Sequence, residues 1–248
     1  MSYYVNDLYK WFSKFNNKTL KIKGEELNFE IELNKKSLLH LIGVHYISKN
    51  SKYLRGSDLI KKVIGGNYND QKIIEQISRN NPQMVDSFKT RLSNLKPFLE
   101  NLENARLVEV TKSNTKLKSN YLALQSRDKD FLLLGLASND YEDYFETFII
   151  ENSNSYFKNT TINEPVKSIT EILDDGTEVP FSFDEEKQKI YSQARLNREI
   201  KLDDEIKRNN RLKEEPKSLV NEMKKLDKQV KESNKDMNNR NTNKDMEI

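Results

Sequence analysis

Residues 35–47 constrain the fold of this chain most, because they form its most apolar helix-like run. They contain both histidines of the 248-residue sequence, His40 and His45, five positions apart. Asn34 stands just before them as a candidate N-cap, so the pattern predicts a helix over 35–47. At about 100° per residue, His45 lies in the main apolar stripe, whereas His40 and Gly43 point to the other side. Such an all-round apolar helix is typical of a segment buried between layers.

Two imidazoles in such a helix have a structural and a functional interpretation. A histidine inside an apolar stripe is more often a core residue than a catalyst, which favours a structural role for His45. His40 lies near Gly43, where the missing side chain lets another backbone or a ligand approach closely. Imidazole also has an ordinary pKa that suits general acid–base chemistry near neutrality. Both interpretations of His40 stay open at this point.

The distribution of residue types limits the folded part of the chain. All seven glycines lie at or before Gly176, and Tyr191 is the only aromatic residue after Phe183. The chain up to about residue 183 is long enough to bury a sizeable core. It has no cysteine, which excludes disulfides, thiolate catalysis and cysteine metal sites. The net charge of +3 permits a nucleic-acid partner without indicating one.

The sequence shows neither a secretory signal pattern nor an apolar run approaching about 18 residues. We therefore expect a cytoplasmic protein that does not enter a membrane.

Periodicity predicts helices in the first half of the chain and strands in its middle. Two alternating runs around Gly24 predict a hairpin over 19–33. Pro97 should kink or split the helix that contains it. The predicted helices besides 35–47 cover residues 6–15, 58–64, 72–78 and 83–102. From Arg106 onward the period becomes two, and the predicted strands cover residues 107–111, 117–125, 131–137, 145–151 and the shorter 156–157.

Consecutive strands with short turns imply an antiparallel meander, and the helices would cover one of its faces. The fold class is therefore α+β, with helices packed on a curved antiparallel β-sheet. Residues 161–183 read as a linker and a β-hairpin around Asp174-Asp175-Gly176. Residues 184–248 read as a long charged helical tail, interrupted at Pro216, with weak coiled-coil spacing and a disordered end.

A few polar residues outside these apolar patterns are candidates for chemistry. An acidic cluster, Asp140, Glu142, Asp143 and Glu146, could hold a hard cation, although a solvated turn explains it better. Thr147 is predicted to share a strand face with Phe145 and Ile149, where its hydroxyl needs a partner. The remaining candidates are dispersed along the chain, and each is an ordinary residue by itself: His40, Arg55, Lys118 and Tyr144.

Four segments together resemble the pattern of a known family, the phage-associated barnase–EndoU–colicin–RelE-like nucleases, fourth family. The segments are His40-Leu41-Ile42-Gly43-Val44-His45, Arg55-Gly56, Lys118-Ser119-Asn120-Tyr121-Leu122-Ala123-Leu124 and Tyr144-Phe145-Glu146-Thr147-Phe148. The resemblance covers roughly residues 15–158, in order, and the histidine segment is its most specific part. It implies an RNase-like domain over residues 1–160.

The resemblance also implies metal-independent RNA cleavage without a cofactor. By motif match it places His40, His45, Lys118 and Thr147 among the catalytic residues, and Arg55 and Tyr144 among those that bind the RNA substrate. This chain departs from the family pattern at Asn120, which stands for an acidic residue, and at Glu146, which stands for proline.

Two functions follow as hypotheses. The first is an endoribonuclease, acting as a phage or prophage toxin or a host-defence effector. The second is an inactive phage protein of the same fold that binds a protein partner, as a regulator or inhibitor of a host system. In either case the C-terminal tail would dock a partner or mediate self-association.

Overall fold

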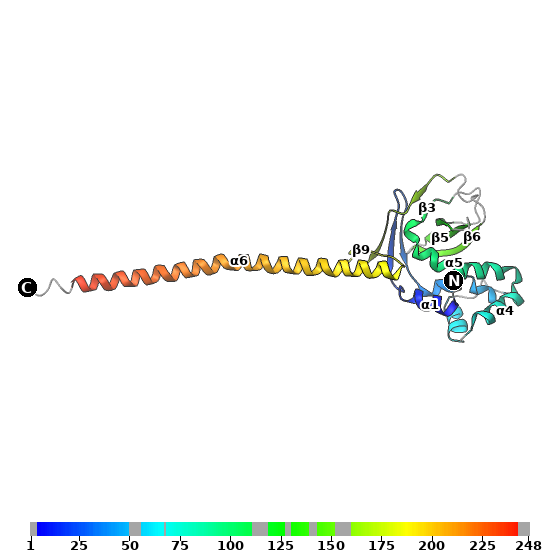
Figure 1. Cartoon of the computed structure of the whole chain (residues 1–248), viewed down its shortest axis with the longest axis horizontal. Coiled ribbons are helices and arrows are strands. Elements are labelled where there is room, and N and C mark those ends of the chain that lie inside the picture. The colour runs from blue at the N-terminus through cyan, green and yellow to red at the C-terminus, as the bar shows by residue number, and fades with distance from the viewer. Residues whose placement is uncertain are drawn as a thin grey trace, which may run out of the picture. The chain divides into compact units, whose positions relative to one another are not determined.

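The computed structural model describes residues 4–49, 56–66, 68–110, 119–126, 130–138, 143–151 and 160–242. The chain divides into two units, Met1–Tyr191 and Ser192–Ile248. In the first unit, helices pack on a nine-stranded, mostly antiparallel sheet, which confirms the predicted α+β class. Figure 1 shows α1, α4 and α5 gathered on one side of the strands. Among the described residues, no helix combines the length and apolarity needed to cross a membrane.

The chain begins with α1 (Val5–Ser13) and the predicted hairpin of β1 (Thr19–Lys23) and β2 (Asn28–Glu32). The two strands pair antiparallel, and every second residue of each is buried. The turn closes where the Gly24 N–H donates to the Leu27 carbonyl at 2.8 Å.

The helices between this hairpin and the meander are short, except α5 (Val85–Glu100). Pro97 lies inside α5, which continues through it, so the predicted split does not occur. The reason is tertiary: Leu95, Phe98 and Leu99 around the proline are buried in the core and hold the helix against the sheet. The bounds are α2 (Lys35–Leu41), α3 (Gly56–Leu59), α4 (Asp70–Asn80) and α5 (Val85–Glu100), with short turns η1 (Val44–Ile47), η3 (Ile60–Ile64), η4 (Pro82–Met84) and η5 (Leu102–Asn104).

The sheet order is β7-β3-β4-β5-β6-β2-β1-β8-β9. Strands β3 to β6 are successive antiparallel neighbours, which confirms the predicted meander. It joins the first hairpin through a short parallel contact of β2 with β6, where Ile31 faces Asp143. The predicted strand 156–157 lies outside the described residues. The strand bounds are β3 (Arg106–Val108), β4 (Asn120–Gln125), β5 (Phe131–Ser138), β6 (Asp143–Glu151), β7 (Asn163–Pro165), β8 (Ser168–Ile172) and β9 (Glu178–Pro180).

The predicted hairpin after residue 161 is present as β8 and β9, and its turn uses Gly176 at φ +81°. This hairpin extends the main sheet, because β8 pairs with β1. The preceding residues, which the sequence reads as a linker, form β7 and pair with β3. All nine strands in the described part of the chain therefore belong to one sheet.

The last helix, α6 (Glu185–Thr242), forms the described part of the second unit and begins in the first. Asp184 caps it, since its carboxylate accepts from the N–H groups of Glu186 at 2.8 Å and Lys187 at 3.2 Å. The helix continues through Pro216, where the sequence predicts an interruption. Its flanks are rich in lysine, glutamate, arginine and leucine, which favour helix on both sides of that proline.

Candidate active site

The two histidines lie together because the predicted helix over 35–47 is broken. The helix α2 starts where the Asn34 side chain accepts from the Lys36 N–H at 2.9 Å, and it ends at Leu41. Gly43 then adopts a left-handed conformation, φ 82° and ψ 19°, and the chain continues into η1. Glycine is the usual residue for such a helix end. The prediction of opposite faces for His40 and His45 is therefore wrong: their rings stack with centroids 4.3 Å apart and planes at 22°.

His45 is the buried member of this pair, with 8% of its surface exposed. Its other neighbour is Tyr46, whose ring centroid lies 4.0 Å away. Burial lowers the pKa of His45 to about 3, and the nearby charges of His40 and Arg91 act in the same direction. The His45 ring is therefore neutral at pH 7. It hydrogen-bonds to the backbone carbonyl of His40, while its Nδ1 atom has no partner among the described residues.

His40 is the exposed member of the pair. Partial burial of its ring lowers the pKa of His40, and the charge of Arg91 lowers it further. The carboxylate of Glu146 opposes both effects and raises the pKa. His40 is therefore a solvent-accessible imidazole, neutral at pH 7, under the opposing influence of one cation and one anion.

Arg91 supplies that cation, and sequence analysis missed it. It lies on α5 with 8% of its surface exposed, and a Cβ placed on Gly43 would be 3.7 Å from its Nη1 atom. Burial lowers the pKa of Arg91, whereas an interaction with Tyr46 raises it. The described residues provide no carboxylate partner for this guanidinium. A buried charge without a counter-charge is costly, so it indicates a site for an anion.

The sequence did contain a signal for Arg91. The buried face of α5 carries apolar residues at helical spacing, including Phe88, Leu92 and Leu95. Arg91 follows Phe88 by three positions and precedes Leu95 by four, so it shares their face. Its charge on the apolar face of an amphipathic helix is the signal that marks Arg91 as a candidate site residue.

Strand β6 contributes a β-bulge opposite Gly135. Leu134 pairs with Phe148, but Leu136 pairs with Phe145, so two β6 residues, Glu146 and Thr147, oppose one β5 residue. Gly135 makes room for this bulge, because a Cβ there would lie 3.2 Å from both Ser119 Oγ and Thr147 Cγ2. Bulges often redirect side chains next to active sites.

The bulge also corrects the predicted face of Thr147. Phe145 and Phe148, three residues apart, both enter the helix-side core, whereas Ile149 packs with the cluster on the other face. Thr147 therefore does not share a face with Phe145, because the alternation of two fails across the extra residue.

The two bulge residues line two different hollows. Thr147 lines a hollow of about 370 Å³, which we call the Arg91 hollow, together with Met84, Ser87, Arg91, Ile149, Ile150 and Glu151. Glu146 lines a hollow of about 310 Å³, the Glu146 hollow, together with Phe29, Val110, Ser119, Asn120, Leu136, Ala137 and Ser138. The Ser119 hydroxyl donates to Glu146 Oε2 at 2.7 Å. The bulge thus separates a hollow lined by Arg91 and Glu151 from one lined by Glu146, and the charges of Arg91 and Glu146 act on His40.

Among its described residues, the structure does not bring another predicted site residue into the two hollows. Arg55 and Lys118 lie outside the described residues, so their placement stays a prediction. Tyr144 is half-buried on β6 and pairs across the sheet with Ala137. It does not contribute to either hollow as lined by the described residues.

In the predicted acidic cluster, Asp143 has a structural role. The Asp143 carboxylate accepts from the Ser138 hydroxyl at 2.5 Å and from the Glu30 N–H at 2.9 Å. These bonds tie β6 to β5 and β2 at the parallel junction. Asp140 and Glu142 lie outside the described residues.

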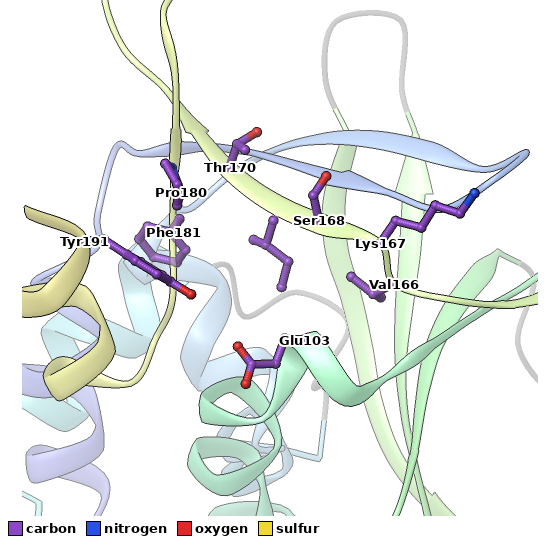
Figure 2. Close-up of a pocket in the computed structure, with 9 residues that line it drawn as sticks. Glu103, Val166, Lys167, Ser168, Thr170, Pro180, Phe181 and Tyr191 are labelled. Atoms are coloured by element: carbon purple, nitrogen blue, oxygen red, sulfur yellow. The ribbon is translucent and has the colours of Figure 1, made fainter. Parts of the chain in front are cut away.

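A third hollow, of about 290 Å³, lies beside the β8–β9 hairpin. Figure 2 shows its lining, with Phe181 and Tyr191 on one side and Glu103 below the strand that carries Lys167 and Ser168. Its described lining includes no histidine or arginine, and Glu103 pairs with Lys187 of α6. It therefore lacks the chemistry of the site at His40.

Comparison with known proteins identifies the family to which this chain belongs. The family model described as phage-Barnase-EndoU-ColicinE5/D-RelE like nuclease4 matches residues 5–189, and the chain belongs to this family. The match confirms the resemblance seen in the four sequence segments and makes the chain a member of a phage-associated nuclease family. No curated protein and no solved structure matches it.

Proposed function

We propose that this chain is a metal-independent endoribonuclease that cleaves RNA through attack of the 2′-hydroxyl on the adjacent phosphate. The observation that carries this proposal is the juxtaposition of Arg91 and His40. Arg91 is a buried guanidinium without a carboxylate partner among the described residues, and its Nη1 atom lies 3.7 Å from the Cβ position of Gly43, three residues after the accessible imidazole of His40. The charge of Arg91 lowers the pKa of His40. A phosphate group would supply the missing negative charge.

The reaction requires little from the protein. The 2′-oxygen forms a bond to phosphorus, the bond to the 5′-oxygen breaks, and a 2′,3′-cyclic phosphate remains. One proton must leave the 2′-hydroxyl and another must reach the departing 5′-oxygen. The extra negative charge on the phosphate oxygens must be stabilised while this happens.

His40 is our candidate for the general base, because its lowered pKa keeps it neutral and able to accept a proton at pH 7. Arg91 would bind the phosphate, and Thr147, a residue that lines the same hollow, would donate a hydrogen bond to it through its hydroxyl. His45 would position the His40 ring through stacking, since its own pKa is too low for proton transfer near neutrality.

The motif match supplies the remaining roles. Lys118 and Arg55 would hold the phosphate, and the departing 5′-oxygen would take its proton from solvent. Tyr144 would stack on a base, as aromatic residues do with unpaired RNA. The phage-associated family supports a role as a toxin or host-defence effector.

One observation favours the alternative function in partner binding. The second unit exposes large apolar side chains along α6, including Ile200 at 52% and Met223 at 70%. An exposed apolar series on a long helix suits contact with a protein partner or another copy of the chain. Partner binding through α6 would also be compatible with nuclease activity, because these residues lie outside the unit that carries His40.

The test is incubation of the purified chain with total RNA in EDTA, beside His40→Ala, Lys118→Ala and Arg91→Gln. We expect cleavage that leaves 2′,3′-cyclic phosphate ends and falls by about 10²–10⁴-fold without His40. Loss of Arg91 should cost about 10²–10³-fold. Arg79→Gln, an exposed arginine on α4, is the matched control and should retain activity. Intact RNA at high protein concentration would exclude the nuclease function and leave partner binding.

A further inference from the structure

The Glu146 hollow has no role in the reaction described above. Among the described residues, its polar lining comes from Glu146, Asn120, Ser119 and Ser138, and its apolar lining includes Phe29 and Leu136. Its polar groups lie beside an apolar surface, as in sites for flat organic ligands. Glu146 is also a residue by which this chain departs from the family pattern.

The hydrogen bonds already made define what a ligand must offer. An ionised carboxylate only accepts, and its two oxygens have about four acceptor positions. Ser119 uses one of them at Oε2. Asn120 Oδ1 accepts from the Val110 N–H at 2.9 Å, so the NH₂ group is the part of the amide left for a ligand. The hollow therefore offers a two-oxygen acceptor and an amide donor.

Guanine matches this pattern better than the other bases. Its Watson–Crick edge presents two adjacent donors, N1–H and the exocyclic NH₂, which can bind both oxygens of one carboxylate. Its O6 atom accepts from an amide. Uracil has a single ring N–H, whereas adenine and cytosine place a ring nitrogen acceptor beside their amino group. Unpaired RNA bases are commonly recognised on this edge.

The position of the hollow connects it to the reaction. Glu146 is adjacent to Thr147 in the β6 bulge, and Ser119 Oγ from the Glu146 hollow and Thr147 Cγ2 from the Arg91 hollow both lie 3.2 Å from the Cβ position of Gly135. A base in the Glu146 hollow would therefore belong to a nucleotide next to the phosphate held at Arg91. We infer that the Glu146 hollow is a guanine subsite for a nucleotide adjoining the scissile phosphate, an inference that rests on the proposed ribonuclease function.

The experiment uses the full chain and DNA oligonucleotides that contain one ribonucleotide, so that a single bond can be cleaved. One series varies the base of the ribonucleotide, and a second varies the base that follows it. We expect guanine at one of these positions to raise kcat/KM by about 10-fold to 100-fold over the other bases. Glu146→Gln should remove this preference, because its amide NH₂ meets the guanine donors. Glu32→Gln, an exposed carboxylate on β2, should preserve it.

The readout is a ratio between bases, so a general change in rate from altered His40 chemistry does not affect it. Cleavage without a guanine preference, or a preference unchanged in Glu146→Gln, overturns the subsite and leaves the ribonuclease function intact. If no oligonucleotide is cleaved, the ribonuclease proposal fails, and calorimetric binding of guanosine and adenosine monophosphates decides the subsite. Selective guanosine binding that Glu146→Gln abolishes supports it, and equal or absent binding overturns it.

Discussion

The rings of His40 and His45 stack with their centroids 4.3 Å apart, although their sequence spacing would place them on different faces of one helix. Two imidazolium ions at this distance repel each other, so protonation of one disfavours protonation of the other. Burial decides which ring stays neutral: His45 has a pKa of about 3, and His40 is exposed. The pair therefore presents one accessible imidazole, His40, stacked on a neutral partner.

The first prediction concerns the influence of Arg91 on His40. Arg91→Gln removes a positive charge that disfavours the imidazolium, so the pKa of His40 should rise. Titration of the imidazole C–H signals by NMR measures this directly, because the chain has two histidines and His45 stays neutral down to about pH 3. The acid limb of kcat/KM should move to higher pH with it. An unchanged His40 titration in folded Arg91→Gln would show that the two groups are not coupled.

The second prediction is a shift of the His40 pKa in the opposite direction. Glu146 raises the pKa of His40, so Glu146→Gln should lower it and move the acid limb of kcat/KM to lower pH. The same NMR titration provides the measurement, with Glu32→Gln as the control that leaves the His40 titration in place. A shift in the same direction as that of Arg91→Gln would contradict the assignment of opposing charges around His40.

The histidine segment shows what the sequence could and could not predict. The N-cap at Asn34, the apolar core positions and the two hairpins are local patterns, and the structure confirms them. The proximity of the two histidines depends on a single left-handed residue, Gly43, inside a run that otherwise favours helix. Periodicity cannot detect such a break, because it assumes the same rotation at every residue.

Sequence periodicity could not predict two other features of the site, each for a different reason. The bulge at Glu146 and Thr147 depends on pairing with Gly135, a partner that lies on another strand. Arg91 was visible as a charge on an apolar helix face, but its relation to His40 depends on tertiary packing that brings Arg91 of α5 beside Gly43. Local sequence patterns therefore predicted the histidine helix and the meander. Tertiary packing determines which charged residues act on His40.

The third prediction concerns stability in acid. The folded pKa of His45 is about 3, below its ordinary value of 6.5, so the unfolded chain binds a proton first as the pH falls. The free energy of unfolding should therefore decrease between pH 6.5 and pH 3, by up to about 1.4 kcal/mol per pH unit from this residue. Urea unfolding at pH 7, 5.5 and 4.5 would show the decrease, and His45→Phe should reduce its slope. An equal slope in His45→Phe would assign the acid sensitivity to other groups.

The fourth prediction concerns Glu164, which joins β7 to the turn of the first hairpin. Only 7% of its surface is exposed, and its carboxylate accepts from the N–H groups of Glu25 at 2.7 Å, Glu26 at 3.0 Å and Leu27 at 2.8 Å. Burial would raise the pKa of Glu164, but the three donors outweigh it and hold the pKa below 4.5. A carboxylate with a lowered folded pKa stabilises the fold above its unfolded pKa, and this contribution is lost as the pH falls through the folded value.

Glu164→Gln replaces one accepting oxygen by an NH₂ group, which cannot accept from the turn. We expect a loss of about 2–3 kcal/mol in the free energy of unfolding at pH 7, since hydrogen bonds to a charged group are each worth more than neutral ones. The difference between the parent and Glu164→Gln should shrink as the pH falls below 4.5, because the stabilisation by the parent carboxylate is lost as the pH falls through its lowered folded pKa. Urea unfolding at pH 7 and pH 3.5 measures both effects. Glu26→Gln, an exposed residue of the same turn, is the matched control, and an equal loss in that variant would show that the Glu164 bonds do not hold the hairpin.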